Sequence, residues 1–208
     1  MSVRRGKAPI KGVIFDFGGV IHSFDFGMFF RSLGGRTNRT FGEMSSLVAG
    51  SGLPRRYELG EISSWEFYRG IVNLCGLRVT EEEFVRAFVA IFTPIETTIC
   101  LIRSLSRSYR LGLLSNTNEW HYDRHIRSVE IFPLFDSVTL SFQVRAMKPA
   151  EAIYRDMLEK IGFPPEECVF VDDLEENVAG AGRMNLHAIH YTDHERLVSS
   201  LAELGVIA

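Results

Sequence analysis

The chain has 208 residues, of which 46% are hydrophobic and 24% are charged, and its formal net charge is −3 at pH 7. Such a composition is ordinary for a globular protein with one sizeable core, or with a core and a small inserted unit. The charge argues against nucleic acid as a partner, since that requires a basic face, and no apolar run reaches the roughly 18–20 residues that would argue for a membrane span.

The N-terminal segment and the cysteines indicate the compartment. The segment MSVRRGKAPIKG is basic but contains no apolar stretch of the roughly 7–15 residues that a signal peptide needs, so we expect none. Cys75, Cys100 and Cys168 lie in apolar surroundings without a close-spaced partner, which predicts buried thiols in a reducing compartment. We therefore expect a cytoplasmic protein without a cysteine-bound metal.

Apolar runs of strand length recur along the chain, separated by segments of helical periodicity. They predict strands at 13–17, 111–115, 137–140, 169–172 and 188–191, and helices at 97–106, 149–161, 175–184 and 194–204. Continuous apolar runs of this length are typical of parallel strands buried on both faces. The pattern predicts an α/β fold with a doubly wound, mainly parallel Rossmann-like sheet, whose active site lies at the carboxyl ends of the strands.

One long segment interrupts the alternation. Between the first two predicted strands the chain shows only helical patterns, with capping signals at Ser63 and Glu66 and at Thr80 and Glu83. We therefore predict that residues 23–92 form a helical domain inserted after the first strand. Residues 1–22 and 93–208 would then form the α/β core domain.

Polar residues end or follow the first two core strands. Asp16 closes the first strand and is followed by Gly18 and Gly19, which let the backbone turn tightly and approach a ligand. Ser115 and Asn116 end the second strand, where a hydroxyl and backbone N–H groups suit a phosphoryl oxygen. Taken singly, each segment is also compatible with an ordinary capped turn.

The later core strands add charge at the same edge. Lys148 precedes the helix after the third strand, and Asp172 and Asp173 end the fourth. Adjacent carboxylates on a buried strand are unfavourable without a cation or hydrogen bonds, and Mg²⁺ prefers carboxylate and carbonyl oxygens. A carboxylate nucleophile, a hydroxyl, an ammonium group and an acid pair on one edge are the groups that phosphoryl transfer requires.

These elements, in this order, resemble the four motifs of the haloacid dehalogenase (HAD)-like hydrolase superfamily. The phrases that carry the resemblance are FDFGGVI, LLSNTN, MKPAEAIY and VFVDDLEENVAGA, which span nearly the whole chain. The chain is most similar to the subgroup with a helical-bundle cap after the first motif, and in particular to α-D-glucose-1-phosphate phosphatase-like members. The segment GEIS, residues 60–63, also matches that group.

The resemblance implies catalytic roles for four residues. Asp16 would be the nucleophile that forms an aspartyl-phosphate. Ser115 and Asn116 would bind the phosphoryl group, and Lys148 would stabilise the charge around Asp16.

The resemblance also implies a magnesium site. Asp16, Asp173 and the main-chain carbonyl of Gly18 would be the protein ligands of Mg²⁺. Asp172 and Asn177 would support those ligands or the waters on the ion.

One position departs from the family pattern. Most phosphatases of the superfamily carry a second Asp two residues after the nucleophile as general acid and base, and here that position is Gly18. General acid–base catalysis contributes about 10²–10⁴-fold, so we expect a slower enzyme unless another group substitutes. His22 and Asp25 are candidate substitutes, with a role in the hinge of the cap as the alternative.

The sequence thus predicts a magnesium-dependent phosphomonoesterase that acts on a small phosphorylated metabolite, a sugar phosphate being one candidate. Two alternatives stay open: a metal-independent 2-haloacid dehalogenase with the same Asp nucleophile, and a weakly active HAD-like binding protein. The acid pair Asp172 and Asp173 favours the phosphatase over the dehalogenase. Retention of Asp16, Lys148 and Asp173 argues against the binding protein.

Substrate specificity is expected to come from the cap. Its arginines are either substrate contacts for an anionic or sugar substrate or solvated turn residues, namely Arg36, Arg39, Arg55 and Arg56. Trp120 and His121 either line the entrance or serve as packing and surface residues. The oligomeric state is left open.

Overall fold

The computed structural model describes residues 8–206 and contains one five-stranded parallel sheet. The spatial order of its strands is β5 (Ser137–Leu140), β4 (Arg110–Ser115), β1 (Gly12–Phe15), β6 (Cys168–Asp172) and β7 (His187–His190). Each predicted strand lies within two residues of an observed one, and the predicted α/β fold class is confirmed. The prediction that no signal peptide is present concerns residues 1–7 in part, and these lie outside the described residues.

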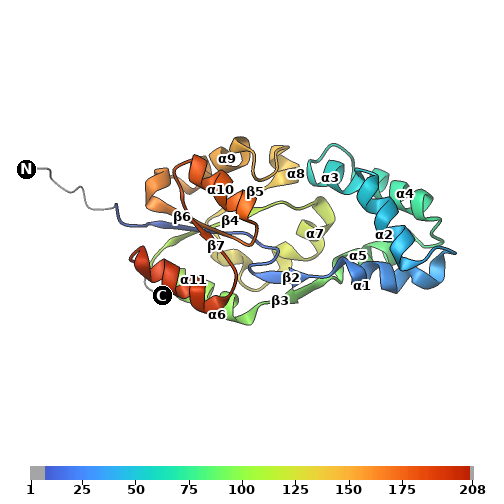
Figure 1. Cartoon of the computed structure of the whole chain (residues 1–208), viewed down its shortest axis with the longest axis horizontal. Coiled ribbons are helices and arrows are strands. Elements are labelled where there is room, and N and C mark those ends of the chain that lie inside the picture. Colours follow the sequence, from blue (N-terminus) through green and yellow to red (C-terminus); the bar gives the residue numbers. More distant parts are fainter. Residues whose placement is uncertain (1–7, 207–208) are drawn as a thin grey trace, which may run out of the picture.

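Helices cover both faces of the sheet (Figure 1). One face packs against α9 (Glu151–Ile161) and α10 (Glu175–Arg183), and the other against α6 (Glu96–Leu105) and α11 (His194–Glu203). Side chains of β1 alternate between the two layers: Val13 and Phe15 belong to the α6 and α11 side, and Ile14 to the α9 and α10 side. Burial on both faces is the reason that this strand has a continuous apolar sequence.

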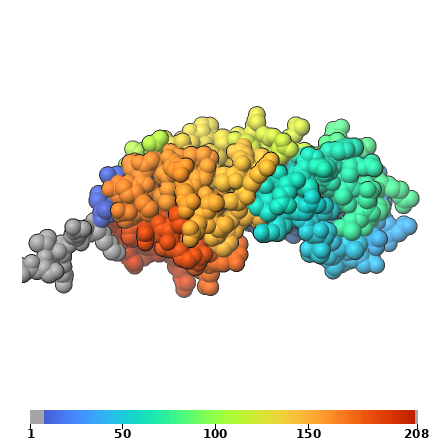
Figure 2. All heavy atoms as spheres, turned by 90° about the horizontal axis from the view of Figure 1, so that it is seen from above, coloured from blue at the N-terminus to red at the C-terminus, as the bar shows by residue number. Residues whose placement is uncertain are grey.

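Five helices form a separate lobe between the first two core strands (Figures 1 and 2). They are α1 (Phe26–Leu33), α2 (Phe41–Gly50), α3 (Leu53–Glu58), α4 (Ser64–Cys75) and α5 (Glu81–Val89). We call this lobe the helical insert. Its buried side chains form a hydrophobic cluster that also includes Trp120 of the core. The capping boxes predicted at the starts of α4 and α5 are both present.

Two short strands connect the insert to the core. The strand β2 (His22–Phe24) pairs antiparallel with β3 (Phe92–Pro94), so the chain enters and leaves the insert side by side. The predicted domain boundaries, after residues 22 and 92, both fall within this pair. The division into two domains stays a prediction, which the separate hydrophobic clusters support.

A second contact holds the insert against the core. The hydroxyl of Ser141, at the start of α8 (Ser141–Val144), lies 2.7 Å from the Glu58 carbonyl oxygen and accepts a 2.9 Å hydrogen bond from Thr117 N. Gly60, with φ of +64°, packs so closely that a Cβ there would lie 2.3 Å from the Phe142 carbonyl oxygen. The end of α3 is therefore held against the start of α8.

The structure bears on two expectations from the sequence, the absence of a membrane-spanning run and the burial of the cysteines. Among residues 8–206, no helix is long and apolar enough to cross a bilayer. Cys75 and Cys168 are buried as predicted, but Cys100 is exposed. It lies on α6 between Ile99 and Leu101, which are buried, so apolar neighbours in sequence do not place a helical residue on the buried face.

Candidate active site

The predicted catalytic residues meet at the carboxyl edge of the sheet. Asp16 follows β1 and Asp172 ends the adjacent strand β6. Lys148 lies between them, with its Nζ 2.8 Å from Asp16 Oδ1 and 2.6 Å from Asp172 Oδ2. All three side chains are buried. The structure therefore assembles a buried carboxylate–ammonium–carboxylate group from three separate parts of the chain.

Burial and charge determine the ionisation of this group. Burial raises the pKa of Asp16 to about 7, an effect that Lys148 opposes and Asp172 reinforces. Burial lowers the pKa of Lys148, but the two adjacent carboxylates more than compensate, so that its pKa is raised. The pKa of Asp173 is also raised, by burial and then by the charge of Asp172. One ammonium group thus faces three carboxyl groups, an arrangement that an added cation would stabilise.

The residues present fit a magnesium ion. Asp16, Asp172 and Asp173 each offer an oxygen within 4.8 Å of the others. Both oxygens of Asp172 already accept hydrogen bonds or pair with Lys148, whereas Asp16 uses only Oδ1 among the described residues. The Asn177 side-chain amide donates a 2.9 Å hydrogen bond to Asp172. The buried Oδ1 of Asn177 has no hydrogen-bond partner in residues 8–206. An unpartnered acceptor beside carboxylates suits a water on a hydrated Mg²⁺.

The turn after Asp16 requires glycine at one position and faces a phenylalanine at another. Gly19 has φ of +76°, and a Cβ there would lie 2.2 Å from Asp173 Oδ2. At Gly18 a Cβ would lie 2.9 Å from the ring of Phe24. The ring of Phe24, from β2, therefore occupies the space into which a side chain at position 18 would extend.

Ser115 and Asn116 both line a pocket at the end of β4 but differ in their partners. The Asn116 side chain donates a 3.1 Å hydrogen bond to the Lys148 carbonyl oxygen and accepts a 2.8 Å hydrogen bond from the Lys148 N–H. Its amide therefore joins the loops of residues 116 and 148. The Ser115 hydroxyl makes no hydrogen bond with any described residue and is available to a ligand.

Neither candidate substitute for the missing acid is suited to that role. His22 is buried, stacks on Phe17, and has its pKa lowered to about 4 by burial and by His125. Asp25 caps α1 and pairs with Arg31 at 2.5 Å, and these hydrogen bonds lower its pKa. Both groups are therefore deprotonated at neutral pH, and neither lines the pocket that contains Ser115.

The four arginines of the insert that were candidate substrate contacts have other partners or are exposed. Arg36 pairs with Glu83 at 2.9 Å, and Arg56 forms a longer ion pair within the insert. Arg39 is exposed, and Arg55 reaches across to the sulfur of Met147 in the core. Within the described part of the chain, none of the four lines the pocket at Ser115.

Other residues take the positions facing the site. Trp120 is buried in the hydrophobic cluster of the insert, whereas His121 lines the pocket. The pocket is completed from the insert side by Phe24, Phe26 and Glu58, which the sequence analysis did not single out. The aromatic run FDFGMFF, residues 24–30, could have indicated an aromatic lining of the site. Which of its side chains face the site depends on how α1 packs, and this cannot be read from the sequence.

Comparison with known proteins identifies the family. Residues 10–185 match the family model of haloacid dehalogenase-like hydrolases. The chain belongs to this family. It is 33% identical over 180 residues to D-ribitol-5-phosphate phosphatase of Bacteroides thetaiotaomicron, covering 81% of this chain and 85% of that protein.

Solved structures of HAD family members share the fold. A predicted HAD-like hydrolase of Porphyromonas gingivalis has a TM-score of 0.80 at 28% identity, covering 97% of this chain and 100% of the other. A HAD family enzyme of B. thetaiotaomicron, in a magnesium complex, has a TM-score of 0.75 at 25% identity, covering 89% and 94%. The predicted family and the prediction of a HAD-like hydrolase are therefore confirmed.

Removing the buried ammonium group tests the electrostatic description of this HAD site. Lys148→Met leaves Asp16 and Asp172 without their counter-charge, so we expect a loss of about 3–5 kcal/mol in the free energy of unfolding. Urea unfolding followed by circular dichroism measures it. The control is Lys160→Met, which removes the half-exposed ion pair with Asp156 and is expected to cost at most about 1 kcal/mol. Equal losses in both variants would contradict the description.

Proposed function

We propose that this HAD family member is a magnesium-dependent phosphomonoesterase acting on a small phosphorylated metabolite, with Asp16 as the covalent nucleophile. The observation that carries the proposal is the buried group of Asp16, Lys148 and Asp172, with Asp173 beside it. It combines a carboxylate nucleophile with fixed positive charge, which is what phosphoryl transfer needs. The named D-ribitol-5-phosphate phosphatase relative supports the reaction class.

The contacts assign a role to each catalytic group. Lys148 and the Phe17 N–H hold the Asp16 carboxylate through Oδ1. One oxygen of this carboxylate attacks phosphorus while the bond from phosphorus to the leaving oxygen breaks, and the other would be the oxygen that binds the magnesium ion. The leaving oxygen takes a proton from solvent. A water then attacks phosphorus and gives up a proton to solvent, the bond to Asp16 breaks, and phosphate is released with the carboxylate restored. In both steps the Ser115 hydroxyl donates to a phosphoryl oxygen, and Asn116 keeps Lys148 in position.

The magnesium ion belongs to the same proposal. Asp16, Asp173 and the carbonyl of Gly18 are the protein ligands, and Asp172 and Asn177 orient them and the waters on the ion. When bound, the ion neutralises charge on the phosphoryl group. The magnesium complex of the 25% identical B. thetaiotaomicron enzyme supports the choice of ion. We further propose that residues 23–92 act as a cap domain over the site.

Hydrolysis of a panel of phosphate esters with and without metal is the direct test. We expect release of phosphate from p-nitrophenyl phosphate and from one or more metabolite esters with Mg²⁺, and loss of that activity in EDTA. Asp16→Asn should lower turnover by at least about 10³-fold, because the nucleophile is lost. The control is Asp123→Asn, which removes a surface ion pair with Arg127. Chloride release from 2-chloropropionate in EDTA would establish the dehalogenase instead.

The role of Asp173 predicts a change in metal dependence. Asp173→Asn removes the charge of a proposed direct ligand, so the Mg²⁺ concentration for half-maximal activity should rise at least about tenfold. Titration of activity with MgCl₂ measures it, and Asp123→Asn should give the wild-type curve. An unchanged curve for Asp173→Asn would remove this residue from the metal site.

The contact between Gly18 and Phe24 predicts a coupled substitution. Gly18→Asp alone should gain little, because the new side chain meets the Phe24 ring. Gly18→Asp combined with Phe24→Ala should accelerate hydrolysis of alkyl phosphates, which have poor leaving groups, by up to about 10²-fold. With p-nitrophenyl phosphate the gain should be small, since its leaving group needs no proton. Equal rates for the single and double variants would show that Phe24 does not block this position.

A further inference from the structure

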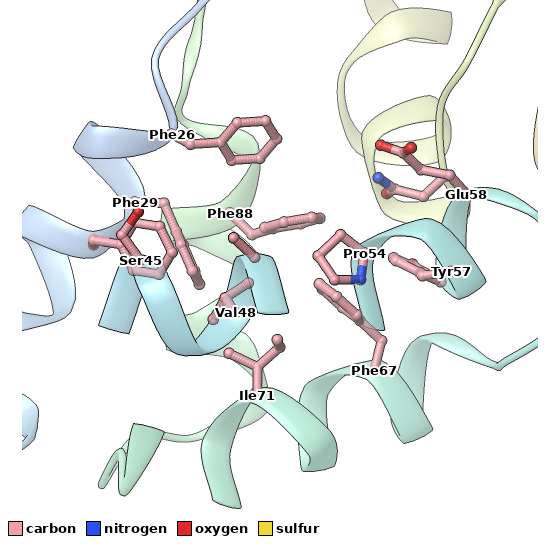
Figure 3. Close-up of a pocket in the computed structure, with 13 residues that line it drawn as sticks. Phe26, Phe29, Ser45, Val48, Pro54, Tyr57, Glu58, Phe67, Ile71 and Phe88 are labelled. Carbon is pink, nitrogen blue, oxygen red and sulfur yellow. The ribbon is translucent and has the colours of Figure 1, made fainter. Parts of the chain in front are cut away.

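The helical insert contains an apolar cavity beside the site. Its volume is about 280 Å³, against about 70 Å³ for the pocket at Ser115. Side chains from α1, α2, α4 and α5 face it, among them Phe29, Val48, Ile71 and Phe88 (Figure 3). We call it the insert cavity. Pockets that take the organic part of a ligand are mainly apolar in this way.

The insert cavity adjoins the pocket at Ser115. Phe26 and Glu58 line both spaces. Aromatic rings also lead from one to the other, with centroids 5.7 Å apart for Phe24 and Phe26, and 6.4 Å apart for Phe26 and Phe88. Phe24 itself lies against Gly18. The pocket at Ser115 and the insert cavity are therefore adjacent and share part of their walls.

The polar groups in the wall of the cavity are mostly engaged elsewhere. The Tyr57 hydroxyl lies 2.6 Å from Ser64 Oγ and accepts a 3.1 Å hydrogen bond from Trp120 N. The Asn118 side chain caps α7 (Glu119–Arg124), where it accepts 3.0 Å from His121 N. A sugar or polyol would therefore bury hydroxyl groups with few partners, which is unfavourable.

Two polar side chains of the wall make no hydrogen bond with the described residues, and neither changes this conclusion. Ser45 is a single hydroxyl on α2. Glu58 lines both spaces. Burial raises its pKa to about 7, an effect that the charge of Arg55 opposes. A carboxyl group that is partly protonated near neutral pH allows an apolar chain to pass beside it.

From this geometry we propose that the insert cavity binds the organic group of the substrate, and that this group is a hydrocarbon chain or ring. The inference rests on the proposed phosphomonoesterase function and names its substrate class: an alkyl or aryl phosphate, in place of a sugar phosphate. The charged phosphoryl group lies at the sheet edge, and the apolar group lies among the phenylalanines of the insert.

Calorimetric titration with alkylphosphonates tests the inference without turnover, because their C–P bond is not hydrolysed. With Mg²⁺ present, the Kd of the full-length protein should fall about three- to fourfold for each methylene added from methyl- to octylphosphonate, until the cavity is filled. A phosphonate with a polyhydroxylated chain should bind more weakly than the alkyl compound of equal length. The same compounds as phosphate esters then report hydrolysis.

Substitutions on α2 test where the hydrocarbon chain of the ligand binds. Val48→Trp and Ser45→Phe fill the insert cavity and should abolish the dependence of Kd on chain length, while the Kd of methylphosphonate stays as in the wild type. The latter value also shows that each variant is folded. Ser46→Trp adds the same bulk to an exposed position of α2 outside the cavity and should retain the full dependence.

The outcomes separate this inference from the proposed function. If esters of the panel are hydrolysed but affinity is flat across the alkyl series, or the filled variants keep the dependence on chain length, the inference is overturned and the phosphatase stands. If affinity rises with chain length but no ester is hydrolysed, the phosphatase is overturned and the cavity remains a site for apolar phosphonates. The absence of binding by every phosphonate would overturn the inference.

Discussion

The ion pairs of Lys148 are the interaction on which the site depends. Its ammonium group is the only positive charge in direct contact with the two buried carboxylates, Asp16 and Asp172, among the described residues. Burying carboxylates without such a partner is strongly unfavourable. The three residues come from parts of the chain that meet only because β1 and β6 are parallel neighbours with their carboxyl ends at one edge. Sheet topology and charge pairing therefore stabilise each other here.

The same pairing explains the chemistry proposed for the edge. One ammonium group does not balance Asp16, Asp172 and Asp173, so the site favours a further cation. Asp172 is already saturated by Lys148, Leu174 and Asn177, which leaves the other two carboxylates to bind that cation. Lys148 thus has two effects: it orients Asp16, and by occupying Asp172 it divides the acid pair into one supporting and one exposed carboxylate.

Much of the core and of its edge was predictable from the sequence, because buried parallel strands have continuous apolar runs and their ends share one edge. The partners of individual side chains were not. Asn116 has the residue type of a phosphate ligand, yet its amide binds the backbone of Lys148, 32 residues away. The insert was harder still. Nine of the sixteen phenylalanines lie between residues 24 and 92, but which of them surround a cavity depends on how five helices pack. Of the arginines that stand out in the sequence, Arg36 and Arg56 form ion pairs within the insert instead of lining the site.

The absence of an acid at Gly18 and the apolar insert have a common structural basis in Phe24. The ring lies on the strand that connects core and insert, fills the space beside Gly18, and contacts Phe26 at the mouth of the insert cavity. An aspartate at position 18 would place a charge against that ring, which is unfavourable without a partner. The position that elsewhere in the family supplies a proton is here part of an apolar wall. In this site, no side chain at position 18 protonates the leaving group, and the neighbouring apolar surface is the one that we propose binds a hydrocarbon.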